Sequence, residues 1–232
     1  MRIRLRGDIE KLKKRVAALA ALVEERFRMA IRALEVNDPW MAEQVIAGDL
    51  VIDREEVDVE EECLKILALH QPVADDLRLI ICVLKMNNDL ERIGDLAVNI
   101  AQHARFIASH DDRIAVPFEY FTMAQKTQEM LKKSLDSLVN VDVNLAYEVC
   151  ATDDEVDKMK YAMQARFAEE ITKNLEPIES AINLFLISRH LERIADHTTN
   201  IAEDVIYLIT GRIHRHGRRR AEDAVLKSVD RK

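Results

Sequence analysis

The chain has 232 residues and a formal net charge of −8, with 48% hydrophobic and 33% charged residues. This composition supports a buried core and excludes a disordered chain, and the negative charge argues against general nucleic-acid binding. Only five glycines and four prolines leave too few turn-forming residues for an all-β fold, so we expect an all-α protein.

Apolar residues recur every three or four positions through almost the whole chain, which is the spacing of amphipathic helices. The second predicted helix begins at Pro39, a residue that suits the first helical position, and Asp38 before it is a favourable N-cap. Trp40, beside this start, is expected to anchor the helix by packing. The pattern predicts six long helices over residues 8–36, 39–70, 73–109, 117–140, 143–174 and 177–211.

The sequence favours a soluble protein of the cytoplasm. Its longest unbroken apolar stretch, Val16 to Val23, is too short to span a membrane. The three cysteines, an odd number without a CxxC motif, are expected to be free thiols in a reducing compartment.

The sequence repeats itself at a shift of 104 positions. The segment "AEQVIAGDLVID" (42–53) aligns with "AYEVCATDDEVD" (146–157), and the cap Asp38 aligns with Asp142. At a shift of 101, "NDLERIGDLAVNIA" (88–101) aligns with "RHLERIADHTTNIA" (189–202), a drift that short insertions would cause. The duplication predicts two up-down-up three-helix bundles, 1–110 and 115–212, related by a pseudo-twofold axis and followed by a basic tail, 213–232.

Each half has two pairs of acids four residues apart, one on its second helix and one on its third. Such residues lie one turn apart on the same helix face, where two carboxylates repel each other but can chelate hard or borderline cations. Antiparallel neighbouring helices can bring the two pairs of a half together. The candidate metal ligands are Asp49, Asp53, Glu91 and Asp95 in the first half, and Asp153, Asp157, Glu192 and Asp196 in the second.

The helical periodicity places these acids opposite the apolar stripe that includes Ile93 and Ile194, so we expect them to face outward. Asn99 and Asn200 fall on the same faces and could support the ligands. A buried ferritin-like di-iron centre is disfavoured, because it needs inward-pointing acids and Glu-x-x-His motifs. From the residues alone, a solvated acidic face remains an equal alternative to metal binding. Another acidic pair, Glu56 and Glu60, has no counterpart in the second half.

The motifs of common enzyme classes are absent from the sequence. It contains no glycine-rich phosphate loop, no GxSxG and no HExxH, which favours a non-enzymatic protein. Two alternatives stay open: a metal-dependent enzyme acting on phosphate compounds, and a structural helical scaffold whose acidic faces aid solubility.

Several segments together resemble the PhoU family of phosphate transport accessory and regulatory proteins. They are the two "LERI(G/A)D…NIA" phrases, "VIAGDLVID", "CATDDEVD" and "HQPVADDLRLI", and the similarity extends over about residues 8–215. The resemblance implies two three-helix bundles related by pseudo-symmetry, in agreement with the duplication. It also implies metal ions (iron, zinc, magnesium or manganese) bound through the acid-x-x-x-Asp pairs, that is, the eight candidate residues.

The resemblance further implies a cytoplasmic, homodimeric adaptor without enzymatic activity. Its implied partners are the ATPase subunit of the phosphate ABC transporter and the sensor histidine kinase of the phosphate two-component system. Such an adaptor negatively regulates phosphate-starvation genes and phosphate uptake, and associates with the membrane only through these partners.

Overall fold

The computed structural model describes residues 2–110, 116–172 and 178–214, and these are helical apart from short connections and helix ends. No strand occurs in these ranges, and the expected all-α fold class is confirmed. The predicted helix 39–70 is present but divided at Gly48. The helices are α1 (Arg2–Val36), α2 (Pro39–Ala47), α3 (Asp49–His70), α4 (Ala74–Ser109), α5 (Phe118–Asn140), α6 (Val143–Thr172) and α7 (Ile178–Thr210).

The same cap begins the second predicted helix of each half. Asp38 Oδ1 accepts hydrogen bonds from the backbone N–H groups of Trp40 (2.9 Å) and Met41 (3.2 Å). Asp142 Oδ1 accepts equivalent bonds at α6, from Asn144 (2.9 Å) and Leu145 (3.4 Å). Each cap satisfies amide groups that have no partner inside the helix, so the duplication is visible at the level of single hydrogen bonds.

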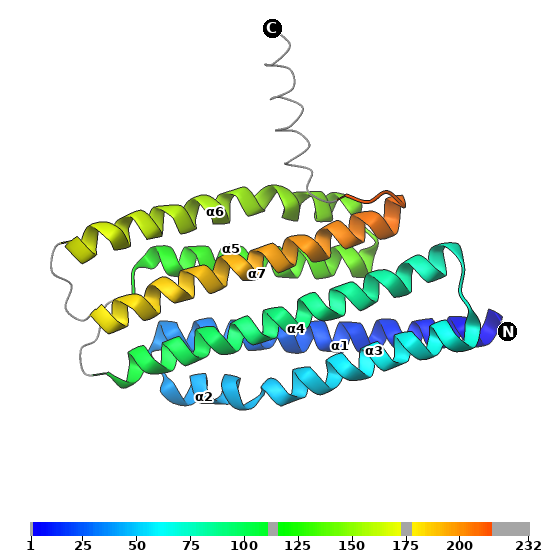
Figure 1. Ribbon diagram of the computed structural model, residues 1–232, viewed down its shortest axis with the longest axis horizontal. Coiled ribbons are helices and arrows are strands. Elements are labelled where there is room, and N and C mark those ends of the chain that lie inside the picture. Colours follow the sequence, from blue (N-terminus) through cyan, green and yellow to red (C-terminus); the bar gives the residue numbers. More distant parts are fainter. Residues whose placement is uncertain (1, 111–115, 173–177, 215–232) are drawn as a thin grey trace, which may run out of the picture.

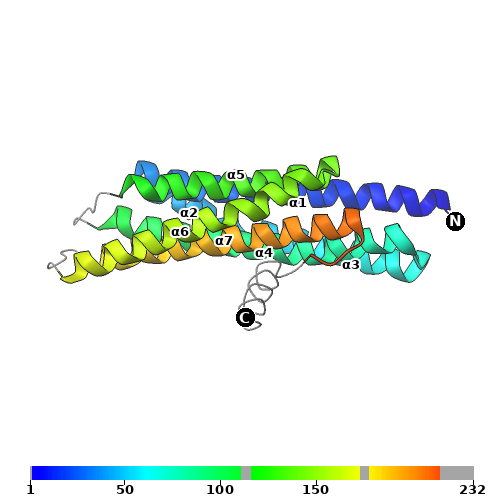
Figure 2. The same ribbon diagram turned by 90° about the horizontal axis from the view of Figure 1, so that it is seen from above.

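The helices form two bundles that share one seam. α1 packs against α3 and α4, with α2 alongside, while α5 packs against α6 and α7. In Figure 1, α3, α4, α7 and α6 lie side by side, and Figure 2 shows α1 and α5 together behind this layer. α4 and α7 make the most extensive contact, which joins equivalent helices of the two halves, as the tandem-bundle prediction requires.

Parts of the predicted division lie outside the described residues. These are residues 111–115 of the predicted linker, the joint 173–177 before α7, and residues 215–232 of the basic tail. The bounds 1–110 and 115–212 therefore stay a prediction.

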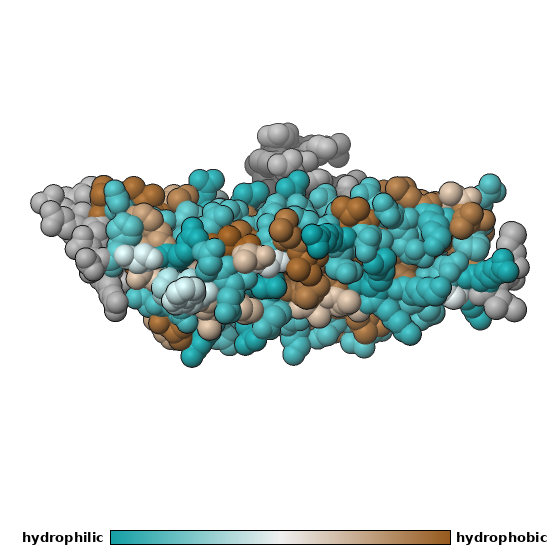
Figure 3. Space-filling view, turned by 90° about the horizontal axis from the view of Figure 1, so that it is seen from below, coloured by the Kyte–Doolittle hydropathy of each residue, from teal (hydrophilic) through white to brown (hydrophobic). Residues whose placement is uncertain are grey.

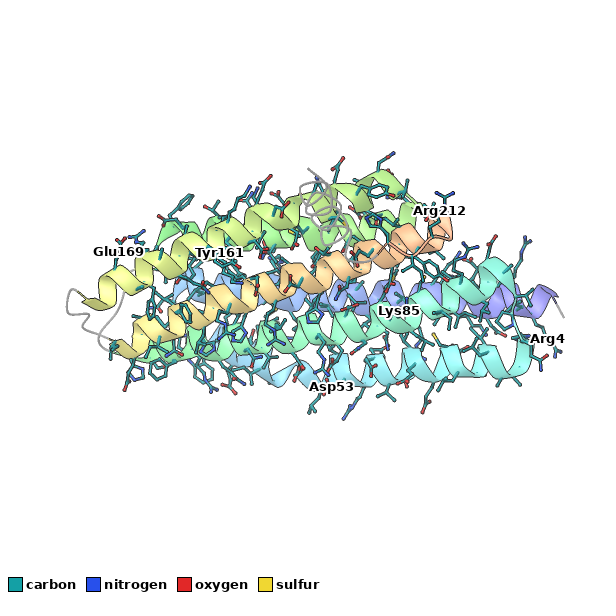
Figure 4. The ribbon with its side chains drawn as sticks, turned by 45° about the horizontal axis from the view of Figure 1, so that its top comes forward. Arg4, Asp53, Lys85, Tyr161, Glu169 and Arg212 are labelled. Carbon is teal, nitrogen blue, oxygen red and sulfur yellow. The ribbon has the colours of Figure 1, made fainter. Side chains whose placement is uncertain are left out.

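Polar groups as well as apolar ones connect the two halves along this seam. Lys85 Nζ on α4 donates to Asp204 Oδ1 on α7 (3.0 Å), near the middle of the molecule (Figure 4). Further along the seam, Asp89 Oδ1 lies 2.8 Å from His197 Nδ1 and accepts a bond from Asn200 Nδ2 (3.1 Å). These bonds give the seam directional contacts that fix how the bundles are aligned.

The apolar stripes meet in a continuous core that extends through both halves. Phe27 of α1, Leu90 and Ile93 of α4, and Ile194 of α7 are all 0% exposed. Because Ile93 and Ile194 point inward, the acids opposite them on α4 and α7 are directed away from the core.

Gly48 allows a close approach that the sequence pattern did not reveal. The guanidinium group of Arg26 occupies the space beside Gly48, where an added Cβ would lie 2.2 Å from Arg26 Cζ. Arg26 Nη1 also donates to the backbone oxygen of Gln44 (3.1 Å) at the end of α2. The division between α2 and α3 is confined to the first half, since α6 continues through the equivalent position, Thr152.

The expected packing role of Trp40 is wrong, because its side chain is 79% exposed. α2 packs against α1 and α4 through the side that carries Ala42 and Val45, both 0% exposed, and this packing leaves Trp40 outside. Seen from below, the molecule is mostly hydrophilic, with separate hydrophobic patches (Figure 3). No helix in the described part of the chain is long and apolar enough to cross a membrane.

The cysteines are free, as expected: Cys63 and Cys82 are buried and Cys150 is half-buried. Burial raises the pKa of Cys63 to about 12 and that of Cys82 to about 11. Both buried thiols therefore stay protonated near neutral pH and act as small apolar side chains.

Candidate functional site

The four candidate acids of the first half lie in one groove between α3 and α4. Asp49 is the first residue of α3, and Asp53, labelled in Figure 4, follows one turn later on the same helix. Burial, followed by the charges of Asp53 and Asp95, raises the pKa of Asp49. Burial and the charge of Asp95 likewise raise the pKa of Glu91. The charge of Asp95 on α4 reaches Asp49 on α3, and that of Asp53 on α3 reaches Glu91 on α4, so the structure brings together the two pairs that the sequence predicted.

Glu56 is a fifth acid of this first-half groove, and the sequence argument did not include it. Its charge contributes to the raised pKa of Glu91. The amide of Asn87, which is 1% exposed, donates from Nδ2 to Glu56 Oε1 (3.0 Å) and to the Glu56 backbone oxygen (2.9 Å). The sequence did contain a signal for Glu56, namely its spacing of four residues from Glu60. This acidic pair was not counted among the candidates because the second half has no equivalent pair.

The second-half groove, between α6 and α7, contains the other four candidate acids. Burial, then the charges of Glu192, Asp153 and Asp157, raise the pKa of Asp196 to about 6. A lysine also enters this groove: Lys160 Nζ donates to Glu192 Oε1 at 2.5 Å. Burial alone would lower the pKa of Lys160, but the hydrogen bond to Glu192 and its charge raise it.

The acids line the grooves at the surface, as predicted, with one exception. As a whole residue Asp196 is exposed, although neighbouring groups partly desolvate its carboxyl group. Asp49, Asp53, Glu91, Asp95, Asp157 and Glu192 are half-buried. Asp153 is only 8% exposed. It lies four residues after Val149 and three before Val156, and both valines are 0% exposed, so Asp153 shares the inner side of α6.

No three His, Cys, Asp or Glu side chains within the described ranges are gathered closely enough to hold a metal ion as they stand. Basic side chains account for part of this spacing. Arg92 bonds both Glu91 and Asp95 at 3.3 Å, and Lys160 holds Glu192. A cation would have to draw carboxylates away from these partners.

The chemistry of the first-half groove nevertheless fits a cation. Asp49 Oδ1 is buried and has no hydrogen-bond partner among the described residues. A buried carboxylate oxygen that accepts no bond is costly, and an acceptor of this kind is what hard cations bind. Asp49 and Asp53, together with Glu91 and Asp95, are therefore the residues that would hold a metal in this half.

The two asparagines expected to support the ligands lie in different surroundings. Asn200 is exposed and donates to Asp89 in the seam, on the side of α7 that faces α4. Asn99 is half-buried on α4. Their support for a metal stays a prediction.

The raised pKa of Asp196 predicts a pH-dependent stability of the metal-free protein. Because its folded-state pKa of about 6 exceeds the ordinary value of 3.8, the folded state retains a proton that the unfolded state loses between these pH values. Stability is therefore lost as pH rises toward 6. Asp196→Asn removes this ionisation, and we expect it to raise the free energy of unfolding at pH 7.5 by about 1 kcal/mol after allowing for solvent screening. With chelator present, the midpoint of thermal unfolding should then rise by about 2–4 °C.

This gain should disappear by about pH 4, where Asp196 of the parent protein is also neutral in both states. Asp76→Asn, a change at an exposed acid on α4, serves as the control and should give no pH-dependent gain. A midpoint for Asp196→Asn that is equal to or below the parent value at pH 7.5 would contradict the prediction.

The fold and the grooves define a class of protein: an all-α tandem duplication in which each bundle has one acidic groove, between α3 and α4 in the first half and between α6 and α7 in the second. Comparison with known proteins gives this class a family. The model of the PhoU domain matches the chain twice, over residues 16–104 and 121–205. The chain belongs to the PhoU family, which confirms the resemblance seen in the sequence.

Relatives and solved structures agree with this assignment. The chain is 37% identical over 215 residues to a phosphate-specific transport system accessory protein PhoU homolog of Aquifex aeolicus, covering 92% of this chain and 96% of the relative. A homolog of the same description from Clostridium acetobutylicum is 34% identical over 209 residues, with 89% and 94% covered. The crystal structure of PhoU from Pseudomonas aeruginosa matches with a TM-score of 0.87 at 34% identity, covering 89% of this chain and 99% of that one.

Proposed function

We propose that this chain is a non-enzymatic regulator of phosphate homeostasis. The observation that supports the proposal is the PhoU-domain match in both halves, together with relatives of nearly equal length named as phosphate-specific transport system accessory proteins. In this role it acts in the cytoplasm as a homodimer. It connects the ATPase subunit of a phosphate ABC transporter with the sensor histidine kinase of the phosphate two-component system, and it represses phosphate-starvation genes and limits uptake.

The acidic grooves provide the surface through which a cation would act in this adaptor. A bound divalent cation neutralises clustered negative charge and bridges carboxylates. In the first-half groove, Asp49 and Asp53 on α3 and Glu91 and Asp95 on α4 would hold the cation, and the last two would have to leave Arg92. The cation would offset the repulsion between these carboxylates and would make the surface offered to a partner more rigid.

The regulatory role can be tested in cells. Deleting the gene should derepress alkaline phosphatase in phosphate-rich medium, because the kinase would no longer receive the signal of phosphate sufficiency. A plasmid copy of the intact chain should restore repression. Phosphatase that stays repressed in the deletion strain would contradict the proposed role.

The partners can be tested in the same strain. When the tagged chain is crosslinked in phosphate-replete cells and purified, the transporter ATPase and the sensor kinase should be recovered with it. In a strain that lacks one of these partners, the crosslinked product with that partner should be absent. Recovery of neither protein would contradict the adaptor assignment.

Turnover of phosphomonoesters or pyrophosphate by the purified, metal-loaded chain would contradict the non-enzymatic assignment.

A further inference from the structure

The two grooves differ at one repeat-equivalent position. At the shift of 104, Glu56 in "REEVDVE" (54–60) aligns with Lys160 in "KMKYAMQ" (158–164). Each side chain acts on the equivalent acid of its own half. Glu56 adds a further negative charge near Glu91, whereas Lys160 forms an ion pair with Glu192. The duplication has therefore preserved the four acids while reversing the charge of a fifth groove residue.

The position of Lys160 makes this charge effective. Its side chain is 15% exposed and that of Glu192 is 18% exposed, so water screens their attraction less than at an open surface. Asp196, one turn after Glu192 on α7, also lies within the field of the ammonium group. One side chain thus supplies positive charge to acids of the second-half groove.

The first half uses the equivalent position in the opposite way. Glu56 is directed by the buried amide of Asn87, and the aligned residue on α7, Ser188, bonds its own helix at Phe185 instead. The first-half groove thus has five carboxylates, and one of them, Asp49, has a buried oxygen without a hydrogen-bond partner among the described residues.

We propose that Lys160 is a built-in counter-ion of the second-half groove, and that the first-half groove is consequently the tighter binder of divalent cations. The inference rests on the metal binding proposed above and adds which copy of the site binds first. A cation entering the second-half groove must displace the ammonium group from Glu192 and is repelled by it. A cation entering the first-half groove meets Glu56, an additional attractive charge.

Arginines near the grooves do not remove this difference. Arg92 pairs with Glu91 and Asp95 in the first-half groove, but its side chain is 53% exposed, against 15% for Lys160, so water screens its charge more strongly. Its repeat counterpart at the shift of 101 is Arg193. Arg26 lies near Asp49, but its guanidinium group donates to the Gln44 backbone oxygen at the end of α2.

Equilibrium dialysis of the full chain against Mn²⁺, with free Mn²⁺ measured by electron paramagnetic resonance, tests the proposal. The parent protein should show a tighter and a weaker class of sites. Asp53→Asn should weaken binding at the tighter class and Asp157→Asn only at the weaker class, which assigns each class to a groove.

Lys160→Gln should tighten Mn²⁺ binding at the weaker class by at least about tenfold, because a positive charge a few ångströms from the cation is removed. Glu56→Lys should weaken the tighter class by a similar factor.

Two further variants separate charge from structure. Lys160→Arg keeps the positive charge and should bind Mn²⁺ like the parent protein. Lys158→Gln removes an exposed lysine from the same helix and should change neither class. Circular dichroism confirms that each variant is folded, and if Lys160→Gln does not fold, Glu56→Lys alone decides between the outcomes.

Equal affinities of the two grooves in the parent protein, or no gain in Lys160→Gln together with no loss in Glu56→Lys, would overturn this inference and leave the proposed metal binding intact. A parent protein that binds no Mn²⁺ in either groove would overturn both. The regulatory role has its own test in the phosphatase reporter, so the three results can be distinguished.

Discussion

Replacing Glu91, Asp95, Glu192 and Asp196 together by Ala is expected to abolish binding of divalent cations in both grooves. The change removes the two acids that α4 or α7 contributes to each groove, and we expect affinity to fall by more than about 100-fold, since loss of even an outer-shell partner can cost 10–100-fold. Elemental analysis after equilibrium dialysis measures the loss. Helical content should be unchanged, because the acids lie opposite the buried stripe and Ala is the best helix former.

A matched control removes the same number of charges elsewhere. Glu10, Glu35, Glu43 and Asp75 are exposed acids with partners at the surface. Replacing all four by Ala lowers the net negative charge equally but leaves the grooves intact. If this control loses as much metal as the groove variant, general electrostatic attraction rather than the grooves accounts for binding.

Truncation of Phe27 to Ala should give the largest loss of stability for a single change. Phe27 lies in the C-terminal half of α1, is 0% exposed and is among the largest fully buried side chains. Its removal leaves a cavity where α1 packs against α3 and α4, and such changes lower the free energy of unfolding by about 3–5 kcal/mol. Urea denaturation followed by circular dichroism measures this difference.

Arg28→Ala provides the comparison, because Arg28 directly follows Phe27 but its side chain is exposed. The Arg28 side chain is 64% exposed and pairs with Glu25 one turn before it, so its loss should cost less than about 1 kcal/mol. A loss below about 1 kcal/mol for Phe27→Ala would show that α1 is not part of the cooperative core.

Much of the fold could be predicted because duplication and periodicity both depend on local sequence. The caps at Asp38 and Asp142 require only residues two and three positions away, and the stripes that include Ile93 and Ile194 follow from helical spacing alone. The pairing of Asp49 with Asp95 across α3 and α4 was also accessible, since short joints force neighbouring helices to lie antiparallel.

The features that were missed depend on contacts between residues distant in sequence. The division at Gly48 is associated with Arg26 from another helix, and the rotation that exposes Trp40 depends on how α2 lies against α1 and α4. Glu56 was set aside because it had no repeat counterpart, yet this difference distinguishes the two grooves. Repeat comparison detects what two copies share, so a residue that makes them unequal is found only when both copies are seen in space.

The shared layer of α3, α4, α7 and α6 has a consequence for recognition. α1 and α5 lie together behind this layer (Figure 2), and both grooves lie between neighbouring helices of this one layer. A flat partner that is already bound at one groove can bind the other without losing more translational freedom, because the first contact holds it at the surface. The two contacts then act as one bivalent attachment, in which modest individual affinities multiply and the spacing between them selects the partner.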